Sequence, residues 1–173
     1  IVADDKEIVT IVISEKLSGT YNSASAAASM MAPDKISVVD SETSVANLQF
    51  LVKLANNMAR DGSSREEIVA AIEREKKQMS VTLTADTLEY LRRGGRLSGA
   101  QAMIGSLLNI KPIIGLVDGR LEAVGKARGK SKALETLIDS VPENTSHITI
   151  CHILNLEEAL WAKDKLQERF PDI

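Results

Sequence analysis

The first forty residues constrain the fold more than any other stretch, because two apolar runs flank a helix-forming segment. Residues 7–13 read EIVTIVI and residues 35–40 read KISVVD, and both are rich in β-branched side chains. Continuous apolar runs of this kind are typical of strands that are covered on both faces. The alanine-rich sequence between them, which reaches Met31 before Pro33, favours a helix. This order of elements predicts a right-handed parallel crossover and an α/β domain.

The pattern of elements changes near residue 79. Before it, apolar spacing predicts a helix over 41–62 that ends at Gly62, and a capping box, Ser63–Glu66 or Ser64–Glu67, begins the next helix. After it we expect a strand, two helices, a hairpin centred on Asp118-Gly119, a helix, a strand and a final helix. These elements are predicted over 79–85, 86–93, 100–109, 110–127, 129–141, 147–153 and 155–170.

These patterns predict a two-lobed α/β protein. Residues 1–78 would form part of an N-terminal lobe with a parallel sheet, and residues 79–173 part of a C-terminal α+β lobe with an antiparallel sheet. The chain starts at Ile1 and ends on RFPDI, which reads as the approach to another strand. We therefore expect this sequence to be a fragment.

Composition limits the cellular compartment in which we expect the protein and the class of protein to which it can belong. No apolar run approaches the roughly 18 to 20 residues that span a bilayer, and no signal peptide is evident, so we expect a cytoplasmic protein without stable membrane insertion. The single cysteine, Cys151, excludes an intramolecular disulfide framework. Because it falls in the strand predicted over 147–153, we expect its side chain to be buried.

The charge of the chain is unevenly distributed. Nine Lys or Arg lie between Arg92 and Lys132 against two acidic residues, on a chain whose net charge is −3. Such a basic segment indicates an anionic ligand or partner. A solvated face of snorkelling side chains is an equally good interpretation of most of these residues one by one.

A loop of small polar residues follows the first predicted strand. Residues 14–20 read SEKLSGT, and a strand that enters a helix through such a loop aims backbone N–H groups, hydroxyls and the positive helix end at one place. The loop is therefore a candidate anion site at the carboxyl end of a strand. The alternative is that Ser14 satisfies loop backbone and Ser18 caps the helix.

A second unusual stretch contains Gly94, Gly95 and Arg96 within LRRGGRLSG. Adjacent glycines permit positive φ and close backbone approach, and the planar fork of an arginine suits a carboxylate or phosphate. The alternatives are that the glycines end a helix and that Arg96 forms a surface salt bridge.

The signatures of common catalytic and metal sites fail. GKARGKS, residues 125–131, has only three residues between its glycines and is not a phosphate-binding loop of the GxxxxGK[ST] kind. His147 and His152 are five residues apart, so they would point to opposite faces of the predicted strand. We expect no catalytic residue, metal or cofactor.

The two stretches together resemble the DegV family of bacterial fatty-acid-binding proteins. The resemblance rests on ISEKLSGTYNSA near the start, on TLEYLRRGGRLSGAQAMIGSLLNIKPII and on DGRLEAVGKARGKSKAL. It covers essentially the whole chain, including VVDSETS and the RDGSSREEI helix start.

The resemblance implies a DegV-like fold in which one long-chain fatty acid lies in an apolar tunnel with its carboxylate at the lobe interface. The head-group region of the family carries over to Ser14, Ser18, Gly19 and Arg96, and which serine touches the carboxylate stays open. It also implies a lipid-carrying subunit of bacterial fatty-acid kinase, a carrier in phospholipid metabolism that presents the acyl group to a separate catalytic subunit.

This sequence departs from the family at both ends. It lacks the family's N-terminal T-D-S-T run, its T-S-Q-P run and its C-terminal H-x-G-P-G stretch. We do not expect His152 to replace the histidine of that C-terminal stretch.

Two other classes of function remain open from the residues alone. The first is a phosphotransferase or hydrolase that uses the Ser14–Thr20 loop as a phosphate site, although no general base or metal-ligand set is evident near it. The second is a nucleic-acid binder that uses the basic segment, although no nucleic-acid-binding motif accompanies the charge, so we expect no nucleic-acid partner.

Overall fold

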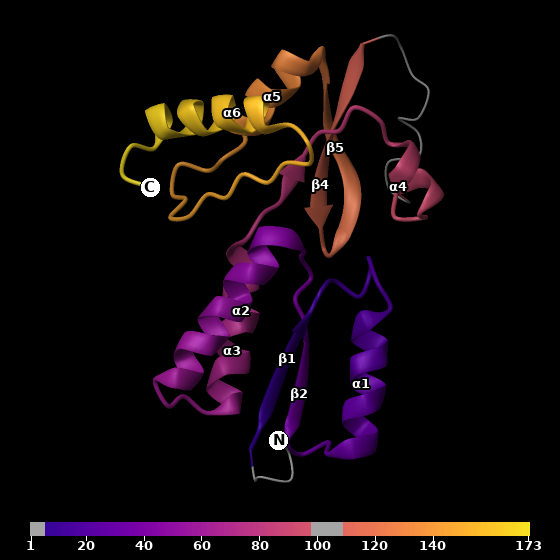
Figure 1. Ribbon diagram of the computed structural model, residues 1–173, viewed down its shortest axis with the longest axis vertical. Helices are drawn as coiled ribbons and strands as arrows, with labels where there is room; N and C mark the ends of the chain where they lie inside the picture. Colours follow the sequence, from indigo (N-terminus) through magenta and orange to yellow (C-terminus); the bar gives the residue numbers. More distant parts are fainter. Residues whose placement is uncertain (1–5, 98–108) are drawn as a thin grey trace. The chain divides into compact units, whose positions relative to one another are not determined.

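The computed structural model of the chain describes residues 6–97 and 109–173 (Figure 1). The chain forms two compact units. The first contains Ile1–Val81 with Leu116–Arg120, and the second contains Thr82–Gly115 with Leu121–Ile173. The bounds of these units differ from those of the predicted lobes, 1–78 and 79–173, which stay a prediction.

The first unit begins with the strand, helix and strand that the sequence predicts. Strand β1 (Ile8–Val12) pairs in parallel with β2 (Ile36–Asp40), with Ile8 opposite Ile36, and α1 (Thr20–Met31) connects them. The parallel crossover prediction is confirmed. In Figure 1, α1 and the next two helices lie on opposite sides of these strands.

Those next two helices are α2 (Val45–Arg60) and α3 (Arg65–Glu75), followed by the 3₁₀ turn η2 (Lys76–Gln78). The second of the two predicted capping boxes is the one that forms, because the Ser64 side chain accepts from Glu67 N–H while the Glu67 carboxylate accepts from Ser64 N–H. The core between helices and sheet consists of Val39, Leu51, Ile68 and Ile72, with Val9 and Ile11 of β1 packed against it.

The second unit contains most of an antiparallel sheet in the order β3-β4-β5, with β3 (Thr82–Leu83), β4 (Ile110–Val117) and β5 (Arg120–Arg128). The predicted hairpin is confirmed, because Asp118 and Gly119 both have positive φ, as a two-residue turn of type I′ requires. The helices of this unit are α4 (Glu89–Arg93), α5 (Lys130–Asp139) and α6 (Leu156–Arg169).

Two sequence predictions about this unit are wrong. Residues 147–153 alternate like a strand but contain none, and Cys151 is exposed rather than buried. A strand exists only where its backbone groups find a partner, and none pairs with this segment within the described ranges. The strand predicted over 79–85 shrinks to two residues. The helix predicted over 100–109 falls mostly outside the described residues.

Candidate functional site

The loop after β1 folds back on itself before α1 begins. The Ser14 carbonyl accepts hydrogen bonds from the N–H groups of Leu17 and Ser18, at 3.0 and 3.1 Å. Ser14 itself is completely buried: its hydroxyl donates to the Gly119 carbonyl at 2.7 Å and accepts from Lys16 N–H at 3.2 Å. A hydroxyl has one proton to donate. In this structure the proton of Ser14 is used by the hairpin turn.

Ser18 has a different environment from Ser14. It does not cap α1, because the N-cap residue is Gly19 and no side-chain cap is formed, so the predicted Ser18 cap is wrong whereas the prediction that Ser14 satisfies loop backbone is confirmed. The Ser18 hydroxyl lies 2.8 Å from that of Thr20 and accepts weakly from Thr20 N–H at 3.4 Å. The first turn of α1 contains no acidic residue. Two hydroxyls therefore stand at the positive end of a twelve-residue helix.

Gly19 is exposed, and the fold does not require a glycine there. Its φ is −70°, which any residue adopts, and a Cβ at this position would meet no atom within 4 Å. The absence of a side chain matters here only if something outside the described residues approaches the backbone closely.

The carboxyl end of β2 joins the same loop through buried polar groups. The Asp40 carboxylate accepts the N–H groups of Glu15 at 3.1 Å and Glu42 at 2.9 Å, and Ser14 N–H donates to the Thr43 carbonyl at 3.0 Å. Ser41 and Thr43 are also buried, and the Thr43 hydroxyl has no partner among the described residues. Ser41 and Thr43 are not among the predicted site residues, although their hydroxyls directly follow a strand in VVDSETS.

Lys76 contacts this turn through its ammonium group. Its ammonium group donates to the Asp40 carbonyl at 3.1 Å and pairs with Glu42 at 2.9 Å and Glu73 at 2.8 Å. Burial lowers the pKa of Lys76, but the hydrogen bonds to Glu73 and Glu42 outweigh burial and raise the pKa overall. Glu42 has a φ of 52°, so the lysine stabilises a backbone turn that is unfavourable for a residue with a side chain.

Arg96 follows α4 in a tight C-terminal turn. Gly95 N–H donates to the Arg92 carbonyl and Arg96 N–H to the Leu91 carbonyl, the two bonds of a Schellman motif. Gly95 occupies the left-handed position with φ +72°, so the helix-end interpretation of the glycines is confirmed. The Arg96 side chain is exposed and its Nη1 donates to the Gly94 carbonyl. The buried Leu97 anchors the chain directly after it.

The basic segment is partly neutralised by its neighbours. Glu89 accepts from Arg92 and Arg93, and these hydrogen bonds lower the pKa of its carboxyl to about 2. Further ion pairs join Lys111 to Asp86, Lys130 to Glu158 and Lys132 to Glu135. Three exposed cations on one face of β5 form no ion pair within the described ranges: Arg120, Lys126 and Arg128.

The predicted site residues divide between the two units. The structure brings Ser14, Ser18 and Gly19 together in one loop of the first unit, and Arg96 belongs to the second. Their joint action on one head group is a proposal.

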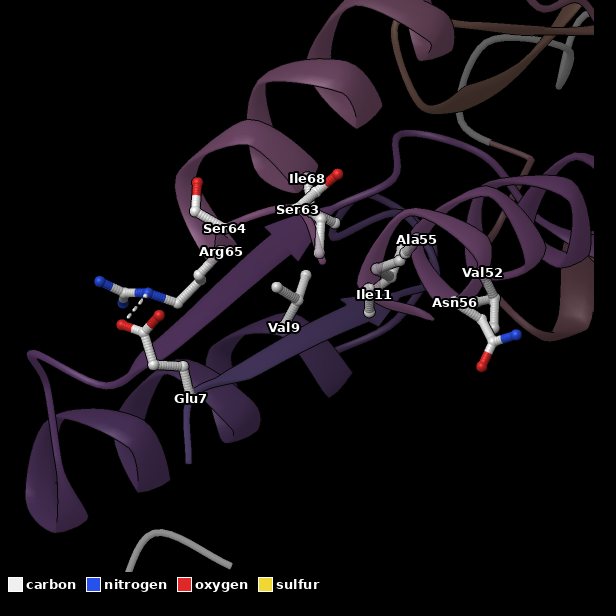
Figure 2. Close-up of a pocket in the computed structure, with 11 residues that line it drawn as sticks. Glu7, Val9, Ile11, Val52, Ala55, Asn56, Ser63, Ser64, Arg65 and Ile68 are labelled. Carbon is white, nitrogen blue, oxygen red and sulfur yellow. Dashed lines mark ion pairs between the residues drawn. The ribbon is translucent and has the colours of Figure 1, made fainter. Parts of the chain in front are cut away.

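A separate groove of about 490 Å³ with a mixed polar and apolar lining runs along β1 (Figure 2). Its lining includes Val9 and Ile11 from β1 and Val52 and Ala55 from α2. The ion pair between Glu7 and Arg65, at 3.1 Å, closes one end. None of the predicted site residues lines this groove.

The described residues contain no helix long and apolar enough to cross a bilayer. The same residues contain no group of three or more His, Cys, Asp or Glu that could hold a metal ion.

The comparisons with known proteins agree on one protein family. The family model described as an uncharacterised protein of the DegV family matches residues 1–173. A DegV domain-containing protein of Caldanaerobacter subterraneus subsp. tengcongensis is 40% identical over 132 residues, which are 76% of this chain and 47% of the relative. The chain thus spans about half the length of this curated relative.

Two solved structures are also similar. One, described as fatty acid binding of a DegV family protein from Thermus thermophilus, has a TM-score of 0.71 at 39% identity and matches 78% of this chain and 48% of its own. The other is the Streptococcus pneumoniae fatty acid kinase B3 protein loaded with linoleic acid. It has a TM-score of 0.81 at 27% identity and matches 96% of this chain and 62% of its own.

Proposed function

This chain belongs to the DegV family, and from that membership we propose that it binds a long-chain fatty acid and carries it without transforming it. The observation that carries the proposal is its 39% identity to a Thermus thermophilus DegV protein described as binding fatty acid. The Streptococcus pneumoniae protein loaded with linoleic acid supports the same class of ligand.

The physical chemistry of a fatty acid explains why such a site needs few polar contacts. At about 0.8 kcal/mol for each buried CH₂, an acyl chain of about 14 methylenes offers roughly 11 kcal/mol of transfer free energy before ordering costs. The carboxylate has the opposite requirement, because an unpaired buried charge is very costly. We infer that the tail lies in an apolar tunnel and that the head group is held at the lobe interface.

We assign the head group to the Ser14–Thr20 loop and to Arg96. Ser18 is the better candidate for direct contact, because among the described residues its hydroxyl bonds to Thr20 of the same loop, at the positive end of α1. Ser14 would then act by holding the loop, since its proton is used by Gly119. Gly19 leaves space for a carboxylate to approach the backbone. The guanidinium of Arg96 would complete the neutralisation.

We further propose that the protein works in the cytoplasm and presents the acyl carboxylate to the catalytic subunit of a fatty-acid kinase. The similarity to a fatty acid kinase B3 protein supports this partner. The exposed cations of β5 would bind an acidic surface of that partner or an acyl phosphate. These cations are Arg120, Lys126 and Arg128.

Arg96→Ala tests the head-group assignment, with Arg93→Ala as its matched control. Both arginines are exposed, and Arg93 lies at the end of α4, where it pairs with Glu89. Native mass spectrometry and lipid extraction should find one fatty acid per wild-type chain and per Arg93→Ala chain. The loss of a charge-assisted hydrogen bond of about 1.5 to 3 kcal/mol should reduce retention in Arg96→Ala at least tenfold.

The same measurement separates this proposal from its rivals. Equal lipid content in Arg96→Ala and wild type would remove Arg96 from the site, and a wild-type protein that never retains lipid would refute the carrier. Steady ATP or phosphoester turnover that disappears in Ser14→Ala would instead favour the phosphotransferase or hydrolase.

A further inference from the structure

The turns that follow β1 and β2 are joined to each other by hydrogen bonds. One of these bonds lies between backbone groups, because Ser14 N–H donates to the Thr43 carbonyl at 3.0 Å. Another involves a side chain: the carboxylate of Asp40, the last residue of β2, accepts from Glu15 N–H at 3.1 Å. Asp40 therefore holds the residue directly after Ser14, at the start of the turn formed by residues 14–18.

A single oxygen of Asp40 serves both turns. Its Oδ1 atom accepts from Glu15 N–H of the 14–18 turn and, at 2.9 Å, from Glu42 N–H of the turn after β2. The sheet fixes this oxygen, because Asp40 pairs with Val12 at the end of the parallel ladder. Groups carried by strands are held more precisely than groups carried by loops. Asp40 is thus a fixed bridge between two turns.

The 14–18 turn is also held from the side of the hairpin between β4 and β5. The buried Ser14 hydroxyl donates to the Gly119 carbonyl at 2.7 Å. A Cβ on Gly119 would lie only 2.5 Å from Ser14 Oγ and 3.6 Å from Glu42 Cα, so the hairpin turn packs there without space for a methyl group. The 14–18 turn is therefore held on two sides, by the hairpin turn and by Asp40.

The end of the 14–18 turn carries the hydroxyl that the proposed function assigns to the head group. The Ser14 carbonyl accepts from Ser18 N–H at 3.1 Å, so the start and the end of the turn are bonded to each other. The Ser18 hydroxyl then lies 2.8 Å from that of Thr20, where α1 begins. A displacement of Glu15 would therefore displace Ser18, only three residues later.

We propose that Asp40 is a positioning residue for the fatty-acid head group, an inference that rests on the proposed function. Its Oδ1 atom fixes Glu15 N–H and, through the 14–18 turn, sets the place of the Ser18 hydroxyl. Asp40 acts through the turn and does not itself contact the head group, because two carboxylates repel each other. The property that matters is the acceptor oxygen, not the negative charge.

Asp40→Ala and Asp40→Asn separate these two properties in the protein as its cells produce it. Alanine removes the acceptor, whereas asparagine keeps an acceptor oxygen and removes the charge. Dissociation constants are measured for linoleic acid, with which the Streptococcus pneumoniae relative is loaded, and for linoleyl alcohol, which has the same tail without the carboxylate.

Asp40→Ala should weaken binding of linoleic acid about tenfold or more, because the hydrogen bond to the charged head group is misplaced. Its binding of linoleyl alcohol should change by less than about threefold, and Asp40→Asn should bind both ligands within about threefold of wild type. The matched control is Asp34→Ala, because Asp34 is exposed before the opposite end of β2. This control should bind both ligands as wild type does.

Three results would overturn the positioning role of Asp40. The first is wild-type binding of linoleic acid by Asp40→Ala. The second is an equal loss of linoleic acid and linoleyl alcohol in that variant, which would indicate general damage to the fold. The third is an Asp40→Asn protein that binds linoleic acid as weakly as Asp40→Ala does.

Amide hydrogen exchange tests the same contact without a ligand. Glu15 N–H should exchange slowly in wild type and in Asp40→Asn, and about tenfold or more faster in Asp40→Ala. Ser41 N–H, which donates to the Val12 carbonyl, should stay protected in all three proteins. If Asp40→Ala does not fold, fast exchange of Glu15 N–H in wild type would still overturn the proposal.

The outcomes also separate this inference from the proposed function. A wild-type protein that binds neither ligand would refute the proposed function and, with it, the role of Asp40. Wild-type protein that binds linoleic acid, together with an unaffected Asp40→Ala, would overturn the role of Asp40 alone.

Discussion

At the scale of the residue, the two serines of the loop after β1 have different roles despite their identical side chains. Ser14 is buried and its hydroxyl bridges to Gly119, a residue 105 positions away in the sequence. Ser18 is only half-buried and bonds to Thr20, two positions away. The motif predicts an anion site but does not distinguish the serine that holds the loop from the serine that is accessible. Only the distant contact makes that distinction.

Gly19→Ala separates a structural role of this glycine from a ligand-binding role. Because the backbone at Gly19 suits any residue and a Cβ meets open space, we expect the free energy of unfolding to change by less than about 0.5 kcal/mol. The amount of extracted fatty acid should nevertheless fall, because the methyl group blocks approach to the backbone. Thermal melting and lipid extraction on one preparation check both. Wild-type lipid content in a stable Gly19→Ala protein would remove Gly19 from the site.

The ion pairs of Glu89 should make the stability of α4 depend on pH. Its folded pKa is lowered to about 2 from an ordinary value of 4.5 by hydrogen bonds from Arg92 and Arg93. The stabilisation is therefore complete above pH 4.5 and is lost as the pH falls toward 2. Backbone NMR shifts of α4 should report this loss in wild type. Glu89→Gln should lack the transition, and an identical transition in that variant would assign it to another group.

At the scale of the element, the strongest predictions are those made by local chemistry. The first two strands, the helix that ends before Gly62, the capping box and the Asp118-Gly119 hairpin are all present. Each depends on residues only a few positions apart. The start of α1 differs by one residue from a Ser18 cap, because the Ser18 hydroxyl bonds to Thr20 instead. The prediction of a strand over 147–153 is wrong, because a strand requires a pairing partner that can lie far away in the sequence.

Lys76→Met tests how the end of β2 is held. The ammonium group pairs with the exposed carboxylates of Glu42 and Glu73, which water can solvate in its absence, and donates to the part-buried Asp40 carbonyl, so its removal should cost about 1 kcal/mol in unfolding free energy. Lys77→Met is the control, because Lys77 is exposed in the same 3₁₀ turn. Urea denaturation measures both variants. Equal midpoints for the two would show that the Lys76 contacts contribute nothing to stability.

At the scale of the whole molecule, the fold pairs many of the positive charges that are clustered in the sequence with acidic side chains. The basic segment from Arg92 to Lys132 predicts a field for an anionic partner. Much of it is instead neutralised by Asp86, Glu89, Glu135 and Glu158. Among the described residues of this segment, Arg120, Lys126 and Arg128 on β5 are exposed cations outside these ion pairs. The proposed docking surface for an acidic partner would therefore be smaller than the linear count of charges indicates.

Local sequence patterns were enough to predict the α/β class, the order of most elements and the loop that forms the candidate site. Periodicity, turn residues and caps act over a few positions and are therefore legible in one dimension. Packing between distant segments makes the hairpin turn accept the proton of Ser14 and buries Ser41 and Thr43 beside it. These are contacts between segments distant in sequence. Their existence depends on how the elements pack, which no local pattern records.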